Sequence, residues 1–145
     1  MSNVTFRLIL REQFVLLHDL SYAGPSVTSE VDSLLGQVFI GGFFCPERDR
    51  EIEIRLSLPT DEERGATTLD IYRNLKTNPD RGLSVNIFLA RRSPHLYQAL
   101  EKALEVSVSR VMESVVAVYA EALRGPLLEI VKGDSWEDGF VVEWS

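Results

Sequence analysis

The stretch 93–123, closed by Gly125 and Pro126, is the feature that most constrains what this chain can fold into. Ser93 can cap a helix N-terminus, and Pro94 suits the first helical position, where a missing N–H costs nothing. Gly125 can adopt the left-handed conformation just past the last turn, and Pro126 cannot continue a helix. These signals predict one helix over 93–123, roughly 45 Å long at about 1.5 Å per residue. Such a helix sets the architecture but names no reaction.

Apolar residues recur every three or four positions along this predicted helix, with charged residues largely opposite. The apolar set is Leu96, Leu100, Leu104, Val108, Val111, Val115, Val118 and Ala122. From Leu104 onward the spacing also fits about three heptads. Either the whole face packs on the protein's own sheet, or the valine-rich second half also contacts a partner protein or a second copy in a homodimer. Valine is a weak helix former and needs burial, which favours contact on more than one side. The predicted interface residues there are Val108, Val111, Met112, Val115, Val118 and Tyr119.

Alternation of apolar and polar residues predicts strands in the rest of the chain. The clearest strand is 51–58, with Ile52, Ile54 and Leu56 facing inward. Two glycines, Gly41 and Gly42, interrupt the strand at 38–44, which indicates a bulge or the close approach of another segment. Further strands are predicted at 4–10, 83–90, 127–131 and 140–144.

Segment 11–20 stays open between strand and helix. Residues 14–20 suit the second arm of a hairpin, but Phe6, Leu10, Phe14 and Leu17 also have helical spacing.

Two short helices and several loops complete the prediction. The helices are 28–36, with Val31, Leu34 and Leu35 as its apolar stripe, and 67–75, with Leu69, Tyr72 and Leu75. The loops are 22–26, 46–50, 59–65, 78–82 and 132–139. The order of elements predicts a single α+β domain over 1–145. In it, an antiparallel sheet of about five to seven strands packs against one long helix in the C-terminal half and two short helices.

Composition narrows the classes of function. A formal net charge of -7 disfavours nucleic acid as a partner, since phosphate binding needs a basic face. The N-terminus lacks the pattern of a signal peptide, and no apolar stretch reaches membrane-spanning length, so we expect a cytoplasmic protein with no membrane partner. Cys45 is the single cysteine, which excludes an intrachain disulfide. With only His18 and His95 beside it, we expect no metal site and no cofactor.

The best chemical candidate is an anion site at the start of the long helix, formed by Arg91, Arg92, Ser93 and His95. Free N–H groups and the positive end of the helix dipole attract anions there, and arginine geometry suits phosphate or carboxylate. The alternative is that both arginines are solvated or paired and that His95 is a surface residue.

No catalytic constellation is predicted. His18 and Asp19 would point to opposite faces of a strand, and Cys45 lies in an apolar stretch that predicts a buried, inert thiol.

An acidic loop around Trp136 is a second predicted protein interface, formed by Asp134, Trp136, Glu137 and Asp138. Tryptophan is enriched at binding hot spots, and the carboxylates would steer a basic partner. In the alternative, Trp136 folds back over the sheet to cover Trp144 or Phe140.

Three classes of function follow from these patterns. The first is a non-enzymatic protein-binding module: a small acidic cytoplasmic adaptor, inhibitor or immunity-type protein. The second is a ligand-binding domain or small enzyme that recognises a phosphorylated or carboxylated molecule near Arg91, Arg92 and His95. The third is a structural subunit of a larger assembly.

Overall fold

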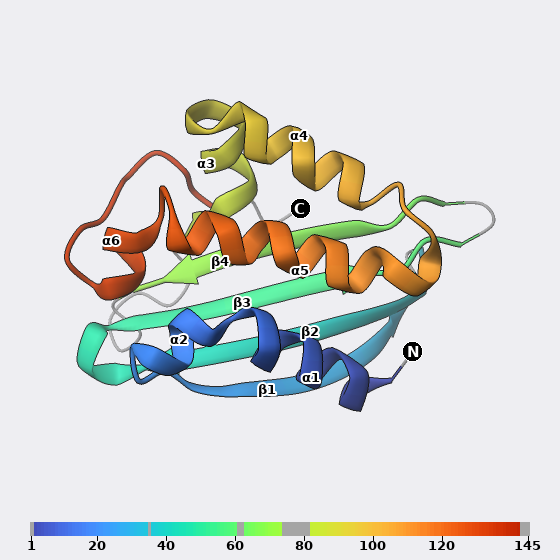
Figure 1. Cartoon of the computed structure of the whole chain (residues 1–145), viewed down its shortest axis with the longest axis horizontal. Coiled ribbons are helices and arrows are strands. Elements are labelled where there is room, and N and C mark those ends of the chain that lie inside the picture. The colour runs from blue at the N-terminus through green and yellow to red at the C-terminus, as the bar shows by residue number, and fades with distance from the viewer. Residues whose placement is uncertain (1, 35, 61–62, 74–81, 143–145) are drawn as a thin grey trace.

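A five-stranded antiparallel sheet forms the base of the protein, for which a computed structural model describes residues 2–34, 36–60, 63–73 and 82–142. The strands are β1 (Ala23–Asp32), β2 (Gly36–Cys45), β3 (Arg50–Ser57), β4 (Ala66–Tyr72) and β5 (Gly82–Ser84). Each strand pairs with the next one in sequence, so the order across the sheet is β1-β2-β3-β4-β5 (Figure 1). The predicted α+β class with an antiparallel sheet is therefore confirmed.

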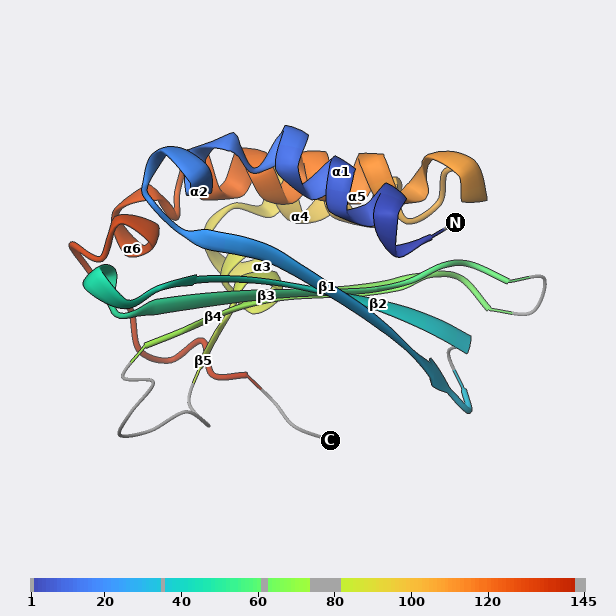
Figure 2. The same ribbon diagram turned by 90° about the horizontal axis from the view of Figure 1, so that it is seen from below.

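The main helices cover one face of this sheet (Figure 2). The helices are α1 (Asn3–Gln13), α2 (Val15–Asp19), α3 (Val85–Arg92), α4 (Pro94–Ala103), α5 (Val108–Arg124) and α6 (Leu128–Lys132). A single 3-10 turn, η1 (Pro46–Arg48), joins β2 to β3. Helix α1 packs over β1 and β2, α5 packs beside α1, and α4 packs against α5. Among the described residues, no helix is both long and apolar enough to cross a membrane.

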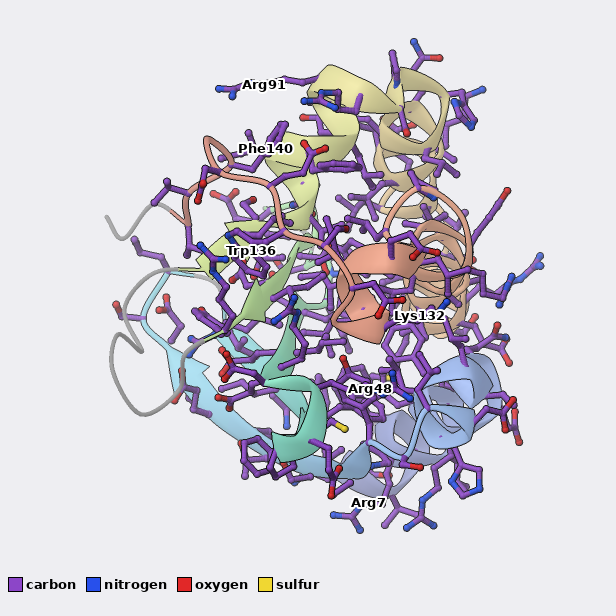
Figure 3. The ribbon with its side chains drawn as sticks, turned by 90° about the vertical axis from the view of Figure 1, so that its left-hand side faces the viewer. Arg7, Arg48, Arg91, Lys132, Trp136 and Phe140 are labelled. Atoms are coloured by element: carbon purple, nitrogen blue, oxygen red, sulfur yellow. The ribbon has the colours of Figure 1, made fainter. Side chains whose placement is uncertain are left out.

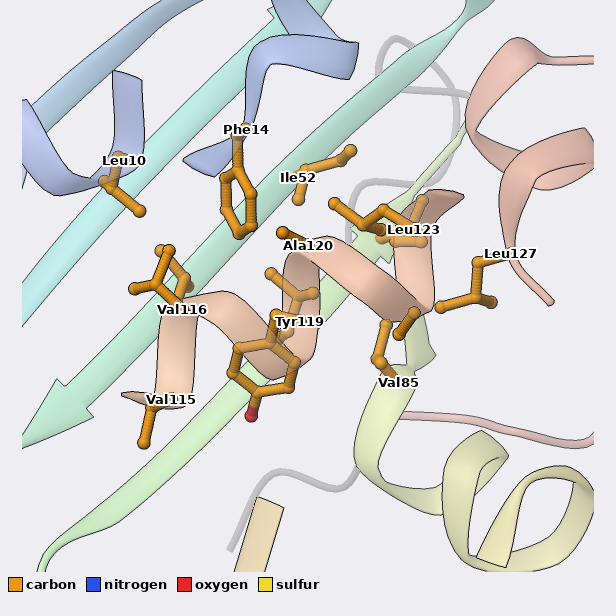
Figure 4. Packing of buried hydrophobic residues seen from close by; sticks show 14 of the residues in the cluster. Leu10, Phe14, Ile52, Val85, Val115, Val116, Tyr119, Ala120, Leu123 and Leu127 are labelled. Carbon is orange, nitrogen blue, oxygen red and sulfur yellow. The ribbon is translucent and has the colours of Figure 1, made fainter. Parts of the chain in front are cut away.

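The core lies between the sheet and this helical layer. Alternate residues of β3 face the helices and are fully buried, as predicted for Ile52, Ile54 and Leu56. Helix α5 supplies the opposing side chains and lies directly over β3 and β4 (Figure 4). Burial of the apolar side chains that the sheet and the helices direct toward each other is the dominant favourable contribution to the free energy of folding.

The predicted continuous helix over 93–123 is wrong, because the chain turns back at residues 104–107 and forms two helices. Ser107 precedes α5, and its carbonyl accepts hydrogen bonds from the N–H groups of Arg110 and Val111 at 2.8 and 3.1 Å. Folding back lets α4 bury its apolar face against α5 as well as the core. The three-and-four spacing continues across the break, so the apolar pattern alone concealed it.

The residues predicted to begin and end the helix at 93–123 are confirmed only in part. Pro94 does occupy the first turn of α4, but the buried Ser93 side chain makes no capping hydrogen bond. Gly125 ends α5 with φ -101° rather than in the left-handed region, and its N–H donates to the Glu121 carbonyl at 3.0 Å.

The N-terminal stretch is helical, so the strand predicted at 4–10 and the hairpin arm at 14–20 are wrong. Ser2 caps α1 by accepting a hydrogen bond from the Thr5 N–H at 3.2 Å. The helical alternative is the one confirmed, since Phe6, Leu10, Phe14 and Leu17 are all buried. By contrast, Val4 and Leu8, which the strand pattern would have buried, are 63% and 51% exposed.

The two short predicted helices at 28–36 and 67–75 are strands or turns instead. Segment 28–36 belongs to the β1–β2 hairpin, where Val31 and Leu34 are each 85% exposed and so form no packed stripe. The loop predicted at 22–26 is largely the start of β1. Residues 67–72 belong to β4, because each of them is in register with a residue of β3 and Leu69 and Ile71 enter the core. Leu35, Leu75 and the predicted turn at 78–81 lie outside the described residues.

Three predicted strands near the C-terminal half are also corrected. The strand at 83–90 ends at Ser84, whose hydroxyl accepts from the Ile87 N–H at 3.3 Å and so starts α3. Segment 127–131 is mostly α6, whose Ile130 and Val131 are buried on helical rather than alternating spacing. Of the strand at 140–144, only a bridge from Val141 to Leu83 forms among the described residues.

Gly41 allows α1 to approach β2, as the close-approach interpretation of the glycine pair predicted. A Cβ atom built on Gly41 would lie 2.5 Å from Leu10 Cδ1 and 3.3 Å from Phe6 Cε2, both on α1. Its neighbour Gly42 faces the opposite side of the sheet, where the nearest atom to such a Cβ is Ser26 Oγ at 3.1 Å.

We expect Gly41→Ala to lower the free energy of unfolding by about 1–3 kcal/mol, because the added methyl overpacks a closed core. Gly42→Ala is the matched control, since it makes the same change on the other face, where a flexible serine can move. Urea denaturation of both variants measures the difference. Equal losses of stability in the two variants would contradict the close packing of α1 on β2.

Candidate functional site

At the predicted anion site, the two arginines bind the C-terminal loop, residues 133–139, instead of standing free. Arg91 donates from Nη1 to the Gly139 carbonyl at 3.1 Å, and Arg92 forms an ion pair with Glu137 at 3.0 Å. Both guanidinium groups lie over the ring of Phe140, at 5.6 and 5.4 Å from its centroid (Figure 3). The two arginines thus hold the loop against the end of α3.

The other two residues of the predicted anion site, Ser93 and His95, take no part in the contacts that the two arginines make. Ser93 is buried between α3 and α4, and His95 is exposed on the first turn of α4. No hydrogen bond links either side chain to Arg91 or Arg92 in the described part of the chain.

The predicted helical interface lies mostly inside the protein. Four of its residues, all on α5, are fully buried, namely Val111, Met112, Val115 and Tyr119. Figure 4 shows Val115 and Tyr119 among the buried side chains of the core. Val118 is half-buried, and Val108 is 48% exposed at the first turn of α5. The surplus apolar surface expected on the second half of the helix is therefore covered by the sheet, α1 and α4.

Tyr119 shows how completely α5 is enclosed. Its hydroxyl donates to Asn86 Oδ1 at 2.8 Å, and burial raises the pKa of this phenol above its usual range. The Asn86 amide in turn donates to the Thr67 carbonyl at 2.8 Å, so the chain of hydrogen bonds joins α5 to α3 and β4.

Two arginines lie against the ring of Trp136, which is labelled in Figure 3. The guanidinium carbon of Arg50 is 5.0 Å from the ring centroid of Trp136, and that of Arg73 is 4.6 Å away. Arg73 also pairs with Asp138 at 3.5 Å. The tryptophan is half-buried against the core, so the loop folds back onto the sheet. Trp144, one of its predicted cover partners, lies outside the described residues.

Two arginines, one at the end of η1 and one at the start of β3, bind this loop and the helix ends through backbone carbonyls. Arg50 is 5% exposed and donates to the carbonyls of Ile130 at 2.8 Å and Ser135 at 3.0 Å. Burial lowers the pKa of its guanidinium. The prediction of a charged turn at 46–50 is confirmed for its position, but Arg50 is buried and not solvated.

Arg48 acts in the same way at the same end of the sheet. It donates to the carbonyl of Leu20 at 2.9 Å, just past α2, and to that of Lys132 at 2.8 Å, at the end of α6. Sequence patterns gave no signal for these contacts, because the partners lie 28 and 84 positions away in the chain.

On the open face of the sheet, two carboxylates lie directly opposite each other. Asp70 of β4 pairs in register with Glu53 of β3, and Asp70 is 8% exposed. Burial, followed by the charge of Glu53, raises the pKa of Asp70 to about 7, against the opposing effect of Arg55. Arg55 instead pairs with Glu53 at 2.8 Å and reaches Glu30 at 3.8 Å.

A hollow of about 400 Å³ opens between α1, α2 and the start of β1. Its lining residues are Arg11, Phe14, His18, Tyr22, Gly24, Pro25 and Phe43. Phe14 and Phe43 pack edge to face at 5.5 Å, and Tyr22 is fixed by a hydrogen bond from its hydroxyl to the Val131 carbonyl. The hollow is therefore preformed, with rigid aromatic walls. Sequence reasoning missed it, because segment 11–20 stayed open between strand and helix and 22–26 was predicted as a loop.

The remaining candidate residues do not form a reactive cluster. Cys45 is fully buried, as predicted, with its Sγ 3.4 Å from Glu47 Oε2. His18 and Asp19 belong to α2 rather than to a strand, and both side chains are exposed. In the described part of the chain, no three His, Cys, Asp or Glu residues gather in a way that could hold a metal ion.

Neither a family model, nor a curated protein, nor a solved structure matches this chain. The function proposed below is therefore argued from the geometry of the chain's own residues.

We expect Arg50→Met to lower the free energy of unfolding by about 2–4 kcal/mol, because it removes the hydrogen bonds from the charged guanidinium to the carbonyls of Ile130 and Ser135. Arg110→Met is the matched control, since Arg110 is exposed on α5. Urea denaturation followed by tryptophan fluorescence measures both. A loss no larger than in the control would show that Arg50 does not hold the C-terminal loop.

We expect Asp70→Asn to remove a pH dependence of stability. A carboxyl whose pKa is near 7 in the folded protein and about 4 when unfolded binds more protons in the folded state, so stability falls as pH rises from about 4 to about 7. The stability gained by the variant should grow over this window, to at most about 4 kcal/mol. Thermal or urea unfolding at several pH values measures it, with the exposed Asp19→Asn as control. A constant difference across the window would contradict the raised pKa.

Proposed function

We propose that this protein is a non-enzymatic protein-binding module that takes up an extended segment of a partner along the free edge of β1. The observation that carries the proposal is an unpartnered edge strand. Residues 26–32 of β1 pair in continuous register with β2, from Gly42 back to Gly36. On its other side β1 has no strand neighbour within the described chain.

An open strand edge presents a row of backbone N–H and C=O groups, and a strand from another chain can pair with them. Natural sheets usually protect such edges with proline, lysine or a covering segment. In β1 the proline, Pro25, lies at the start, before the regular stretch begins. Side chains from residue 28 to residue 32 are all exposed. The stretch is therefore accessible and long enough for a partner strand.

The surfaces predicted from sequence give less support to a protein-binding role. The apolar face of α5 is buried, and the loop around Trp136 is held by Arg50, Arg73 and Arg92. Within the class of protein-binding modules, the specific roles that we propose are those of a cytoplasmic adaptor, inhibitor or immunity-type protein.

The second class, a phosphate- or carboxylate-binding domain, gains no specific support. Its two arginines already contact the Gly139 carbonyl and the Glu137 carboxylate.

The test is selection of linear peptides from a random display library against the whole protein. Strand addition predicts that selected peptides bind through their backbone. Methylation of single peptide nitrogens should abolish binding at every second position and leave it unchanged between, because alternate N–H groups of a strand face its neighbour. Loss of binding at scattered positions, or a failure to select any peptide, would overturn the proposal.

A pair of proline variants locates the site on the protein. N–H groups of adjacent strand residues point to opposite sides, so one of Thr28→Pro and Ser29→Pro removes a donor from the open edge and the other from the ladder with β2. The edge variant should keep its circular dichroism spectrum and lose the peptide. A folded edge variant that binds the peptide normally would place the peptide elsewhere.

A further inference from the structure

We propose that the segment bound along β1 belongs to a different protein and carries two acidic side chains at alternate positions, followed by an apolar side chain that enters the hollow beside Pro25. This inference rests on the proposed strand addition and names the chemistry of the partner.

Helix α1 lies over the helical side of the β1 edge and carries two arginines there. Arg7 and Arg11 are four residues apart and share one side of the helix. Arg7 points toward the side of the molecule that carries β1 (Figure 3). Arg11 lines the hollow together with Gly24 and Pro25 of β1. Neither arginine has an ion pair with a carboxylate of the described residues, so both charges are available to a ligand.

The position of the arginines along β1 follows from the packing of their neighbours. Phe6 and Leu10 are the α1 residues closest to Gly41, and Gly41 pairs in register with Val27 of β1. Arg7 therefore stands near the start of the regular edge, and Arg11 stands beside Gly24 and Pro25, just before it.

The spacing of these charges matches that of a strand. Four residues of α-helix rise about 6 Å, at about 1.5 Å per residue. Two residues of strand span about 6.6 Å, at about 3.3 Å per residue, and they point to the same face. Two acidic residues at alternate positions of an added strand would thus each meet one arginine. An arginine favours a carboxylate as its partner, because the guanidinium can donate hydrogen bonds to both carboxylate oxygens at once.

The hollow that Arg11 lines extends from there toward α2. Its floor consists of Phe14, Tyr22 and Phe43, which are 2%, 5% and 4% exposed. An apolar side chain at the next alternate position of the strand would be buried against these rings. Rigid aromatic pockets of this kind are typical anchor sites in protein interfaces.

Charge disfavours a second copy of this chain as the occupant. If two β1 strands paired with their helices on the same side, Arg7 and Arg11 of one copy would approach the same residues of the other. On the opposite face, Glu30 and Asp32 would likewise approach their own counterparts. Like charges facing each other across paired strands are destabilising. A separate acidic segment is complementary to this edge, although the whole chain has a net charge of -7.

The test compares two labelled ten-residue peptides by fluorescence anisotropy, at roughly physiological salt so that long-range repulsion is screened. Both have threonine at most positions and one phenylalanine. One has aspartate at the two preceding alternate positions, and the other has lysine there. We expect the aspartate peptide to bind the wild-type protein at least about tenfold more tightly, which corresponds to about 1.4 kcal/mol. The double variant Arg7→Glu, Arg11→Glu should reverse this preference.

The matched control is Arg110→Glu, Arg124→Glu, which makes the same change of net charge on exposed positions of α5. It should keep the wild-type preference. Equal affinity for both peptides, or an equal effect of the control, would overturn the inference. If the acidic preference fails but library-selected peptides still show alternating sensitivity to methylation, only the inference about the partner's charges is overturned, and the proposed strand addition is kept.

Light scattering tests whether a second copy of this chain occupies the edge of β1. We expect wild-type protein to have the mass of one chain. A dimer that the edge proline variant converts to a monomer would assign β1 to a second copy and overturn the inference.

Discussion

Hydrogen bonds from two arginines to backbone carbonyls hold α2, α6 and the C-terminal loop to the end of the sheet where β2 connects to β3. Arg48 is the last residue of η1 and Arg50 is the first residue of β3, and their acceptors follow α2 or lie in and after α6. Leu20, Ile130 and Lys132 lie in or next to the last turn of a helix, where carbonyls lack the full set of intrahelical partners, and Ser135 lies in the loop after α6. A guanidinium can satisfy several such carbonyls at once. The placement of α2, α6 and the loop around Trp136 depends on these contacts.

How much of the fold the sequence predicts varies with how local the determining contacts are. Strand β3 was predicted because Ile52, Ile54 and Leu56 alternate with polar residues. Strand β2 was predicted from the apolar run at 38–44, and the role of Gly41 followed from its place in that run. The N-terminal helix was missed because Val4, Phe6, Leu8 and Leu10 satisfy both a period of two and a helical stripe. Tertiary burial decides between them, and it selects Phe6 and Leu10 alone.

The site was harder to predict than the fold. Arg91, Arg92 and Trp136 were recognised as residues with binding chemistry, but their partners, Glu137, Arg50 and Arg73, come from distant positions and use that chemistry inside the protein. The edge strand was concealed because Val31 and Leu34 have helical spacing in a segment that is in fact exposed. An edge is a property of strand order, and strand order is not encoded in local periodicity.

The simple strand order also bears on how the protein is made. Every strand pairs with the one synthesised just before it, and α1 packs on the first two strands. Contacts of short sequence separation form early in folding, and domains begin to fold from the N-terminal side during synthesis. Helix α5, which closes the core over β3 and β4, emerges from the ribosome only after these strands. The nascent chain therefore acquires the β1 edge while the inward faces of its later strands are still uncovered.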